Sequence, residues 1–565
     1  MIDKRSLNRR DFLVAGATTL VAAACGPRLS SDLPFDLILI GGTVYDGTGK
    51  EGLSADVGVK NGRIIALGNL RDKRAGYKID VAGLAIAPGF IDFHSHSDEE
   101  LLLRGEAQSK IRQGVTTEVI GQDGGSFAPL NTKMSDEGFE GLRTSYGITD
   151  TWSDFAGYFR ILQKQGILSN VVSMVGQGTL REFVIGYENR PATSAEIEQM
   201  TALASEAFAQ GAYGISSGLE YTPGSFASTE EIIALCKSMN RHGIYSTHMR
   251  NEDDTLLEAI NEAITIARGA GVDLNISHLK ASGKRNWHKL DPVLARLDEA
   301  RSSGQQVTCD RYPYIAYNTG LANLFPLWSR EGGDDQFVKR LQDESLLDSI
   351  NTTVLDKIEK IGGWNSVMVS SLPSHPDRTR FEGKTMAELT QNGTDPLQLL
   401  REIVIGQEGG GSMVGFAMSE ENTAKVLHYP YCMTASDGSA LAIEGRLRVG
   451  NPHPRAFGTF PRLLGKYVRE NGIMPLAEAV RKITGLPAET LHIRERGFIR
   501  SGYWADLVVF DPKTVADKAT WNDPFQYPDG IPYVIVNGKV VIDDDEYTGD
   551  LPGAVLKAPD DFHFA

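Results

Sequence analysis

The stretch from residue 87 to residue 96 reads Ala-Pro-Gly-Phe-Ile-Asp-Phe-His-Ser-His. Its apolar part, which follows a Pro-Gly pair, is typical of a short buried strand. Because alternate residues of a strand point to the same side, His94 and His96 are predicted to face the same way. Imidazole is a frequent metal ligand, but a His-x-His pair alone is weak evidence of a metal site. A metal site here would therefore need further ligands from the ends of other strands.

The middle of the chain alternates apolar strands with amphipathic helices. The clearest unit joins His248 to His278, which lie thirty residues apart, the length of one strand–helix–strand unit. Its helix is predicted to be capped by Asp254 or Thr255 and to end at Gly269. Eight strands are predicted near residues 86–93, 115–120, 170–175, 212–217, 244–248, 272–278, 306–310 and 431–436. Eight such strands with intervening helices predict an α/β protein with a closed parallel (β/α)8 TIM-like barrel.

Metal-binding residue types stand at the ends of these strands, where barrels of this kind gather their reactive groups. His94 and His96 end the first strand, Asp123 follows the second, His248 ends the fifth, His278 ends the sixth and Asp437 follows the eighth. Any one of them has an ordinary structural explanation, such as a turn at an aspartate before glycine. Their shared placement instead predicts a site for zinc or a related divalent metal.

Strand-rich segments with hairpin turns occupy both ends of the chain. Asn61-Gly62 and Asn537-Gly538 each separate two short apolar runs, which is a typical hairpin pattern. Residues 32–86 and 497–550 are therefore predicted to form one composite β-sandwich, with the barrel at residues 87–496. An insertion at about 319–428 is too long for an ordinary loop and is predicted to be a lid or small subdomain over the barrel mouth.

Residues 1–25 resemble an export signal. Adjacent arginines at positions 9 and 10 precede an uncharged run from Leu13 to Ala24, which is too short to span a bilayer comfortably. The run ends in Ala-Ala-Ala-Cys-Gly, an imperfect lipoprotein box, so Cys25 is either a lipid anchor or incidental to cleavage near the alanines. We expect an exported protein, periplasmic or lipid-anchored in a bacterial envelope.

The length, net charge and cysteine content of the chain limit the kinds of partner that we expect. The 565 residues fit a barrel with an accessory domain. The net charge of −16 is scattered along the chain, which argues against a nucleic-acid partner, since that would require a basic face. Cys236, Cys309 and Cys432 are too widely spaced to indicate a disulfide framework and are expected to be buried. The sequence does not indicate an oligomeric state.

Residues 87–96 resemble the opening motif of the amidohydrolase superfamily. The chain is more closely similar to the N-acyl-D-amino acid deacylase (D-aminoacylase) family, over nearly all of the chain from about Phe35 to Val541. The matching motifs follow in order at residues 218–224, 247–252, 277–280, 310–314, 436–438 and 453–459.

The resemblance implies hydrolysis of the amide bond of N-acyl-D-amino acids, with zinc as the metal. It implies one tight metal position at His248, His278 and Asp123, at which the metal activates a water and polarises the amide carbonyl. It implies a second, weaker position at His94, His96 and Asp437. Asp437 would also be the catalytic residue that takes a proton from the attacking water and delivers it to the leaving amine.

The substrate-binding residues also come from the resemblance. Arg455 and Lys280 would hold the α-carboxylate, with Tyr312 and Tyr221 nearby, and an arginine suits bidentate carboxylate binding. Asn318 stands where a serine contacts this carboxylate in the better-studied pattern.

Two departures from the family pattern bear on the metal and the substrate. Some members have a cysteine in place of Asp123, and many have a histidine in place of Gln177. Another amidohydrolase activity, on cyclic amides such as hydantoins or on D-dipeptides, is one alternative. A non-catalytic binding protein on the same scaffold is a remote alternative, because such proteins typically lose ligands that this chain keeps.

Overall fold

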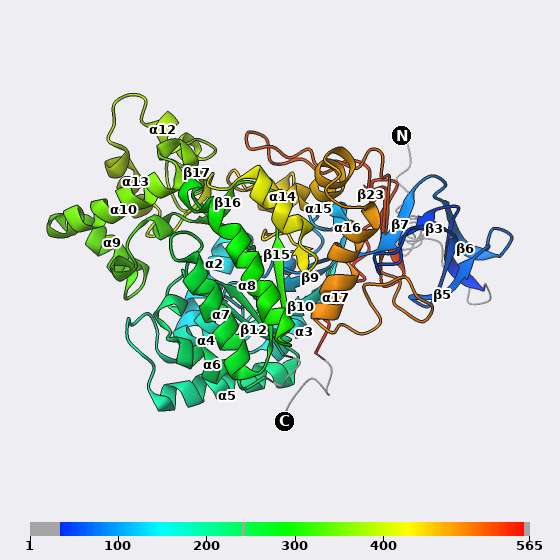
Figure 1. Cartoon of the computed structure of the whole chain (residues 1–565), viewed down its shortest axis with the longest axis horizontal. Helices are drawn as coiled ribbons and strands as arrows, with labels where there is room; N and C mark the ends of the chain where they lie inside the picture. Colours follow the sequence, from blue (N-terminus) through cyan, green and yellow to red (C-terminus); the bar gives the residue numbers. More distant parts are fainter. Residues whose placement is uncertain (1–33, 240–242, 559–565) are drawn as a thin grey trace, which may run out of the picture.

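The computed structural model describes residues 34–239 and 243–558. Figure 1 shows a central barrel, with an additional helical region on one side and a small β domain on the other. The predicted export signal at residues 1–25, with Cys25, lies outside the described residues. Within the described ranges, no helix is both long enough and apolar enough to cross a membrane.

The barrel contains eight parallel strand positions, which confirms the predicted fold class. The strands are β8 (Phe90–Asp92), β9 (Val115–Ile120), β10 (Asn170–Ser173) continued by β11 (Val175–Gly176), β12 (Gly214–Gly218), β13 (Ile244–His248), β14 (Asp273–Ile276), β15 (Val307–Arg311) and β19 (Cys432–Thr434). They pair in parallel in chain order. A parallel bridge between Ser95 and Gly438 joins the first strand position to the last. The closed ring brings all the strand ends to one rim.

The predicted first strand, residues 86–93, is in fact two strands that belong to different sheets. β7 (Ala85–Pro88) pairs with a strand of the small β domain, whereas β8 belongs to the barrel. Gly89 lies between them, and a Cβ at this position would lie 2.1 Å from the Thr116 side-chain oxygen. Only glycine permits the chain to pass so close to β9 as it moves from one domain into the other.

The helix between His248 and His278, α7 (Leu256–Ala270), begins directly after Thr255, one of the two predicted cap residues, but ends later than predicted. Neither predicted cap is made by a side chain, because the Asn251 side chain accepts the backbone N–H of Asp253 and Thr255 instead. The helix ends at Gly271, whose φ is +75°. Gly269, predicted to end it, is helical and packs against Ile233 of the neighbouring helix α6 (Thr229–Cys236).

The small β domain is a sandwich that uses both ends of the chain. One sheet has the order β5 (Arg63–Gly68), β4 (Asp56–Lys60), β1 (Phe35–Ile40), β6 (Ala75–Asp80). The other has the order β23 (Glu546–Tyr547), β22 (Lys539–Asp543), β21 (Tyr533–Val536), β20 (Leu507–Phe510), β7, β2 (Thr43–Val44), β3 (Leu53–Ser54). The antiparallel pairing of β20 with β7 joins the two ends of the chain. Asn61-Gly62 and Asn537-Gly538 have positive φ angles, as tight hairpin turns require.

The segment between β15 and β19 forms a subdomain with its own apolar core beside the barrel mouth. It contains the antiparallel strands β16 (Tyr317–Gly320), β17 (Val367–Ser371) and β18 (Ser412–Gly415), and the helices α9 (Asp334–Gln342), α10 (Leu347–Ile361) and α13 (Pro396–Gly406). The next helix, α14 (Glu420–His428), was included in the predicted insertion but packs on barrel strands β15 and β19. We call the part from β16 to β18 the insertion subdomain.

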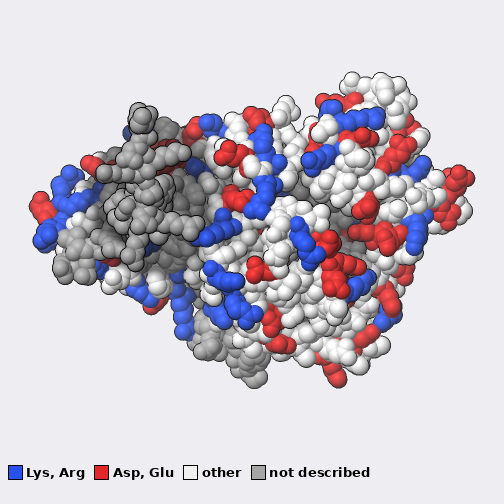
Figure 2. All heavy atoms as spheres, turned by 180° about the vertical axis from the view of Figure 1, so that it is seen from behind, with Lys and Arg blue, Asp and Glu red and all other residues white. Residues whose placement is uncertain are grey.

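The distribution of surface charge and the state of the cysteines agree with the expectations from the sequence. Figure 2 shows acidic and basic side chains interspersed on one face of the molecule, with no continuous basic surface among the described residues in that view. Cys236, Cys309 and Cys432 are buried and unpaired by disulfides.

Candidate metal centre

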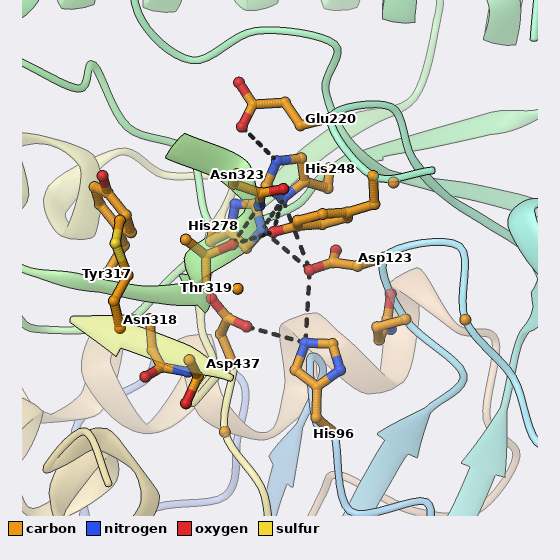
Figure 3. Close-up of a pocket in the computed structure, with 18 of the residues that line it drawn as sticks. His96, Asp123, Glu220, His248, His278, Tyr317, Asn318, Thr319, Asn323 and Asp437 are labelled. Carbon is orange, nitrogen blue, oxygen red and sulfur yellow. Dashed lines mark hydrogen bonds and ion pairs between the residues drawn. The ribbon is translucent and has the colours of Figure 1, made fainter. Parts of the chain in front are cut away.

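The six predicted metal ligands meet at the C-terminal rim of the barrel, and five of them are labelled in Figure 3. Asp123, His278 and Asp437 each have a positive φ, of 52°, 35° and 51°. This left-handed conformation is uncommon for residues other than glycine. Each of the three follows a strand end, and the reversal of the backbone turns its side chain over the barrel axis. Such backbone strain is typical of functional sites.

Four of these residues form what we call the first ligand group: His94, His96, Asp123 and Asp437. The two histidine Nε2 atoms are 3.3 Å apart. His94 Nε2 lies 3.4 Å from Asp123 Oδ1, and His96 Nε2 lies 3.1 Å from Asp437 Oδ1. Zinc bonds of 2.0–2.1 Å in tetrahedral geometry separate neighbouring ligand atoms by about 3.3 Å. The spacing of this group therefore suits a zinc ion.

The second ligand group consists of Asp123, His248 and His278. His248 Nδ1 and His278 Nε2 are 2.9 Å apart, and Asp123 Oδ2 lies 3.8 Å and 3.4 Å from them. Three protein ligands with one open position are typical of a catalytic zinc site. This group therefore has the ligand number and types that a hydrolytic zinc requires.

Asp123 belongs to both groups because its two oxygens point to different histidines. Oδ1 is buried and accepts no hydrogen bond, which is costly for a carboxylate unless a cation satisfies it. Burial by itself raises the pKa of Asp123, but the charges of His94 and His278 hold it well below its usual range. The donor set, the spacing and this unpartnered oxygen all fit a bound divalent metal.

Close backbone contacts fix the position of Asp123. A Cβ on Gly218, at the end of β12, would lie 2.0 Å from the Asp123 carbonyl oxygen. A Cβ on Gly124, whose φ is +81°, would lie 2.7 Å from the Gly218 nitrogen. Both glycines are required for the loop after β9 to approach β12 this closely. The Ser216 hydroxyl also accepts the Gly124 N–H at 3.1 Å.

Asp437 is held between the metal ligands and an arginine. Its backbone N–H donates to the His94 carbonyl at 2.8 Å, and Arg455 Nη1 donates to Oδ2 at 2.8 Å. Burial by itself raises the pKa of Asp437, but Arg455, His278 and His94 hold it well below its usual range. His453 accepts the Arg455 backbone N–H at 3.0 Å and so orients the start of α15 (Arg455–Arg462). One Asp437 oxygen thus faces the metal ligands while Arg455 holds the other.

Carboxylates behind the histidines were not singled out in the sequence analysis. Glu220 lies 3.6 Å from His248 Nε2, and Glu252 lies 3.1 Å from His278 Nδ1. Asp310 accepts the His278 backbone N–H at 2.8 Å. Carboxylates in these positions set the orientation of metal-binding imidazoles. Glu220 and Asp310 also stand at strand ends, so the rule that located the ligands would have located these two as well.

A buried ion pair links the first and last barrel strands beneath the site. Lys110 Nζ donates to Asp92 at 2.6 Å, and Asp92 accepts the Ser436 backbone N–H at 2.8 Å. Lys110 also contacts the Ser436 hydroxyl. Because Asp92 and Ser436 precede His94 and Asp437 by one or two residues, this network fixes one ligand strand against the other. Nothing in the sequence spacing indicates the partnership with Lys110.

The five predicted substrate-binding residues all line one cavity, together with every predicted metal ligand except His94. Lys280 is already paired, with Nζ 2.6 Å from Glu252 and 2.7 Å from His278 Nδ1. Tyr221 OH lies 3.4 Å from His248 Nδ1. The Tyr312 hydroxyl and the Asn318 side-chain oxygen are buried without hydrogen-bond partners. The last two groups are therefore available to a ligand in the cavity.

The cavity has a volume of about 630 Å³ and extends from the metal ligands to the insertion subdomain, which suits a small molecule. Figure 3 shows Tyr317 and Asn318 of the insertion subdomain to one side of the ligand groups, and Thr319 Oγ1 lies 3.3 Å from the Tyr221 hydroxyl. Gln177, at the start of α4 (Gln177–Val184), is fully buried with both amide atoms unpartnered, and it does not line this cavity.

Comparison with known proteins gives consistent matches. Residues 445–542 match the model of the amidohydrolase family. A D-aminoacylase from Alcaligenes xylosoxydans xylosoxydans is 38% identical over 529 residues, which are 93% of this chain and 98% of that protein. An N-acyl-D-aspartate deacylase from the same organism is 34% identical over 529 residues, covering 93% of this chain and 95% of that protein.

A solved structure is also similar over its whole length. It is the N-acyl-D-glutamate deacylase from Bordetella bronchiseptica, complexed with zinc and a phosphonate inhibitor that mimics the tetrahedral intermediate of the reaction. The match has a TM-score of 0.78 and 33% identity, and it covers 93% of this chain and 100% of that chain.

Proposed function

The chain belongs to the N-acyl-D-amino acid deacylases of the amidohydrolase family, and we propose that it hydrolyses the amide bond of N-acyl-D-amino acids. The products are a free D-amino acid and a carboxylate. One observation carries the proposal. In a single cavity, Asp437 presents one oxygen to the metal ligands while Arg455 holds the other.

The enzyme is metal-dependent, and zinc suits its ligands. His248, His278 and Asp123 would hold the tight ion, and His94, His96 and Asp437 would form a second, weaker position that shares Asp123. When bound, zinc supplies Lewis acid chemistry, which polarises the amide carbonyl and lowers the pKa of the attacking water.

Asp437 moves the proton. It is ionised, because Arg455 and the histidines favour its charged form, and an ionised carboxylate can accept a proton from the attacking water. As the C–N bond breaks, the same carboxylate returns the proton to the leaving amine nitrogen. Arg455 keeps the carboxylate in one orientation during both transfers.

The α-carboxylate of the substrate would bind beside Asp437. Arg455 Nη2 has only a weak contact, 3.5 Å from the Asn318 carbonyl oxygen, so it has a donor to offer. The unpartnered Tyr312 hydroxyl can donate to this carboxylate and lies in the same cavity, as does Asn318, whose unpartnered amide oxygen can only accept. Lys280 would add positive charge from behind His278, and Tyr221 would contact the substrate near His248.

The test is a substrate screen of the zinc-loaded enzyme. We expect release of D-amino acids from N-acetyl-D-amino acids, with little turnover of the L enantiomers, hydantoins or D-dipeptides. Failure to hydrolyse any N-acyl-D-amino acid with zinc present would reject the proposal. Hydantoin or D-dipeptide turnover would favour the alternative amidohydrolase activity. Protein without metal and without turnover would favour a binding protein on the same scaffold.

We also propose that residues 1–25 export the enzyme, on the support of the paired arginines and the short uncharged run. We expect the full-length protein to appear in the bacterial envelope fraction. A variant with both Arg9→Lys and Arg10→Lys should remain in the cytoplasm. A Cys25→Ser variant distinguishes the two interpretations of this cysteine, because only a lipid-anchored protein would move from the membrane to the soluble envelope fraction.

A further inference from the structure

We infer that the cavity selects N-acyl-D-amino acids with an uncharged side chain and discriminates against the second carboxylate of acidic D-amino acids. The inference rests on the proposed function and names its substrate class. It separates this chain from the D-aspartate and D-glutamate deacylases to which it is similar.

We place the side chain of the substrate toward the insertion subdomain. The metal ligands and Arg455 lie on the barrel side of the cavity, and residues of the insertion subdomain line another side. Leu324 and Met413 supply apolar surface there, and Ser371 and Ser412 supply neutral hydroxyls. None of these four residues carries a charge that would attract a carboxylate.

The cations of the cavity wall already have carboxylate partners. Among the described residues that line the cavity, the lysines and arginines are Lys280, Lys357 and Arg455. Lys280 lies 2.6 Å from Glu252, and Arg455 Nη1 lies 2.8 Å from Asp437.

Lys357, on α10, is the cation that the insertion subdomain contributes to the cavity wall, and it faces two carboxylates. Its Nζ is 3.7 Å from Asp253. The pKa of Lys357 is raised, chiefly by the charge of Glu220. Glu220 and Asp253 both line the cavity, so they more than balance the charge of this lysine.

A further carboxylate, Glu182, lines the cavity with no cation of the cavity wall beside it, and Lys133, whose charge lowers its pKa, does not line the cavity. It is half-buried and hydrogen-bonded to Tyr187. The part of the cavity that would hold the substrate side chain is therefore negative overall. Glu100 also lines the cavity, but it is not counted, because burial raises its pKa to about 8. A second substrate carboxylate would enter without an unpaired cation in the cavity wall to compensate its lost hydration, which is unfavourable.

One more cation lies behind the wall. Arg330 does not line the cavity, and its Nη1 donates to the Asn323 side-chain oxygen at 2.6 Å. Its Nη2 donates to the Glu220 carbonyl oxygen at 3.3 Å. Asn323 thus stands between Arg330 and the substrate, and it presents a neutral amide to the cavity.

The experiment compares two substrates of nearly equal shape that differ in charge, N-acetyl-D-glutamine and N-acetyl-D-glutamate. We expect kcat/KM of the zinc-loaded enzyme to be about 100-fold higher for the glutamine substrate, as expected for like charges brought together. The assay is run at pH 8 because burial raises the pKa of Glu182. N-acetyl-D-leucine should also be hydrolysed.

A charge-neutralising variant tests the cause. Glu182→Gln should reduce the preference for the glutamine substrate by at least about threefold, because one repelling charge is removed. Glu188→Gln is the matched control, since Glu188 is exposed, lies in the same region and does not line the cavity. This control should leave the preference unchanged.

The outcomes separate the inference from the proposed function. Equal or faster turnover of N-acetyl-D-glutamate would overturn the inference and leave the deacylase function standing. If Arg330→Met then abolished that turnover, Arg330 would be identified as the residue that binds the acid. Absence of turnover for glutamine, glutamate and leucine substrates alike would reject the proposed function itself.

Discussion

The two walls of the cavity are built in different ways. On the barrel wall, every metal ligand stands on a parallel strand end or in the few residues after it, and carboxylates or main-chain groups hold it in place. On the insertion wall, the lining residues come from short antiparallel strands, the 3-10 helix η5 (Leu321–Leu324) and the helix α10, and Lys357, Ser371 and Ser412 are only half-buried. The barrel wall is held in place by specific contacts, and the insertion wall is partly exposed.

This difference indicates a division of labour. Hydrolysis requires the proton carrier and the metal ligands to stay within a fraction of an ångström of one geometry, which barrel strands provide. Recognition of a side chain requires only a surface of suitable shape and charge, which an inserted subdomain can change without disturbing the barrel. Substitutions on the barrel wall should therefore lower kcat, and those on the insertion wall should mainly alter KM.

The largest effect is expected from Asp437→Asn. An amide cannot accept a proton from the attacking water, and general acid–base groups contribute about 100- to 10,000-fold to kcat. We expect a loss in this range with the melting temperature nearly unchanged, measured with N-acetyl-D-glutamine and zinc. Residual activity above about a tenth of the wild-type value would remove Asp437 from the mechanism.

A smaller effect is expected from Glu252→Gln, behind the metal ligand His278. Loss of a carboxylate that orients a metal-binding histidine typically costs about 10- to 100-fold in metal affinity or activity. Zinc content after dialysis and kcat at saturating zinc should both fall. Glu258→Gln is the control, because Glu258 is exposed on α7 and does not line the cavity. If zinc retention is unchanged, Glu252 does not orient His278.

The barrel wall was largely predictable from the sequence, because its metal ligands stand at the ends of regular strands. Strand periodicity and the rule that reactive groups gather at strand ends located all six candidate ligands that the structure brings together. The ends of elements were less predictable. Gly269 and Gly271 look equivalent in the sequence, and only the structure, in which Gly271 has a φ of +75° and Gly269 is helical, shows which one ends the helix.

Partnerships between distant residues could not be predicted. Lys110 lies more than three hundred residues from Ser436, and no periodicity connects them. Lys280 was assigned to the substrate by resemblance, but its ammonium group is 2.6 Å from Glu252, a contact that depends on the loops after β13 and β14. The insertion wall was predicted only as a region, because no sequence pattern indicates which residues of its short strands and helices line the cavity.

The smallest effect is expected from Lys357→Met, and this variant tests the division of labour most directly. Lys357 is an insertion-wall residue whose side chain is 27% exposed and whose contact with Asp253 is 3.7 Å. Partly exposed ion pairs are worth about 1 kcal/mol or less, so kcat for N-acetyl-D-glutamine should fall by no more than about fivefold, with the change mainly in KM. Lys360→Met on the same helix is the control, because Lys360 pairs with Asp254 and Asp356 and does not line the cavity. A loss of kcat as large as that from Asp437→Asn would show that the insertion wall takes part in the chemistry, and the two walls would then have to be treated as one catalytic unit.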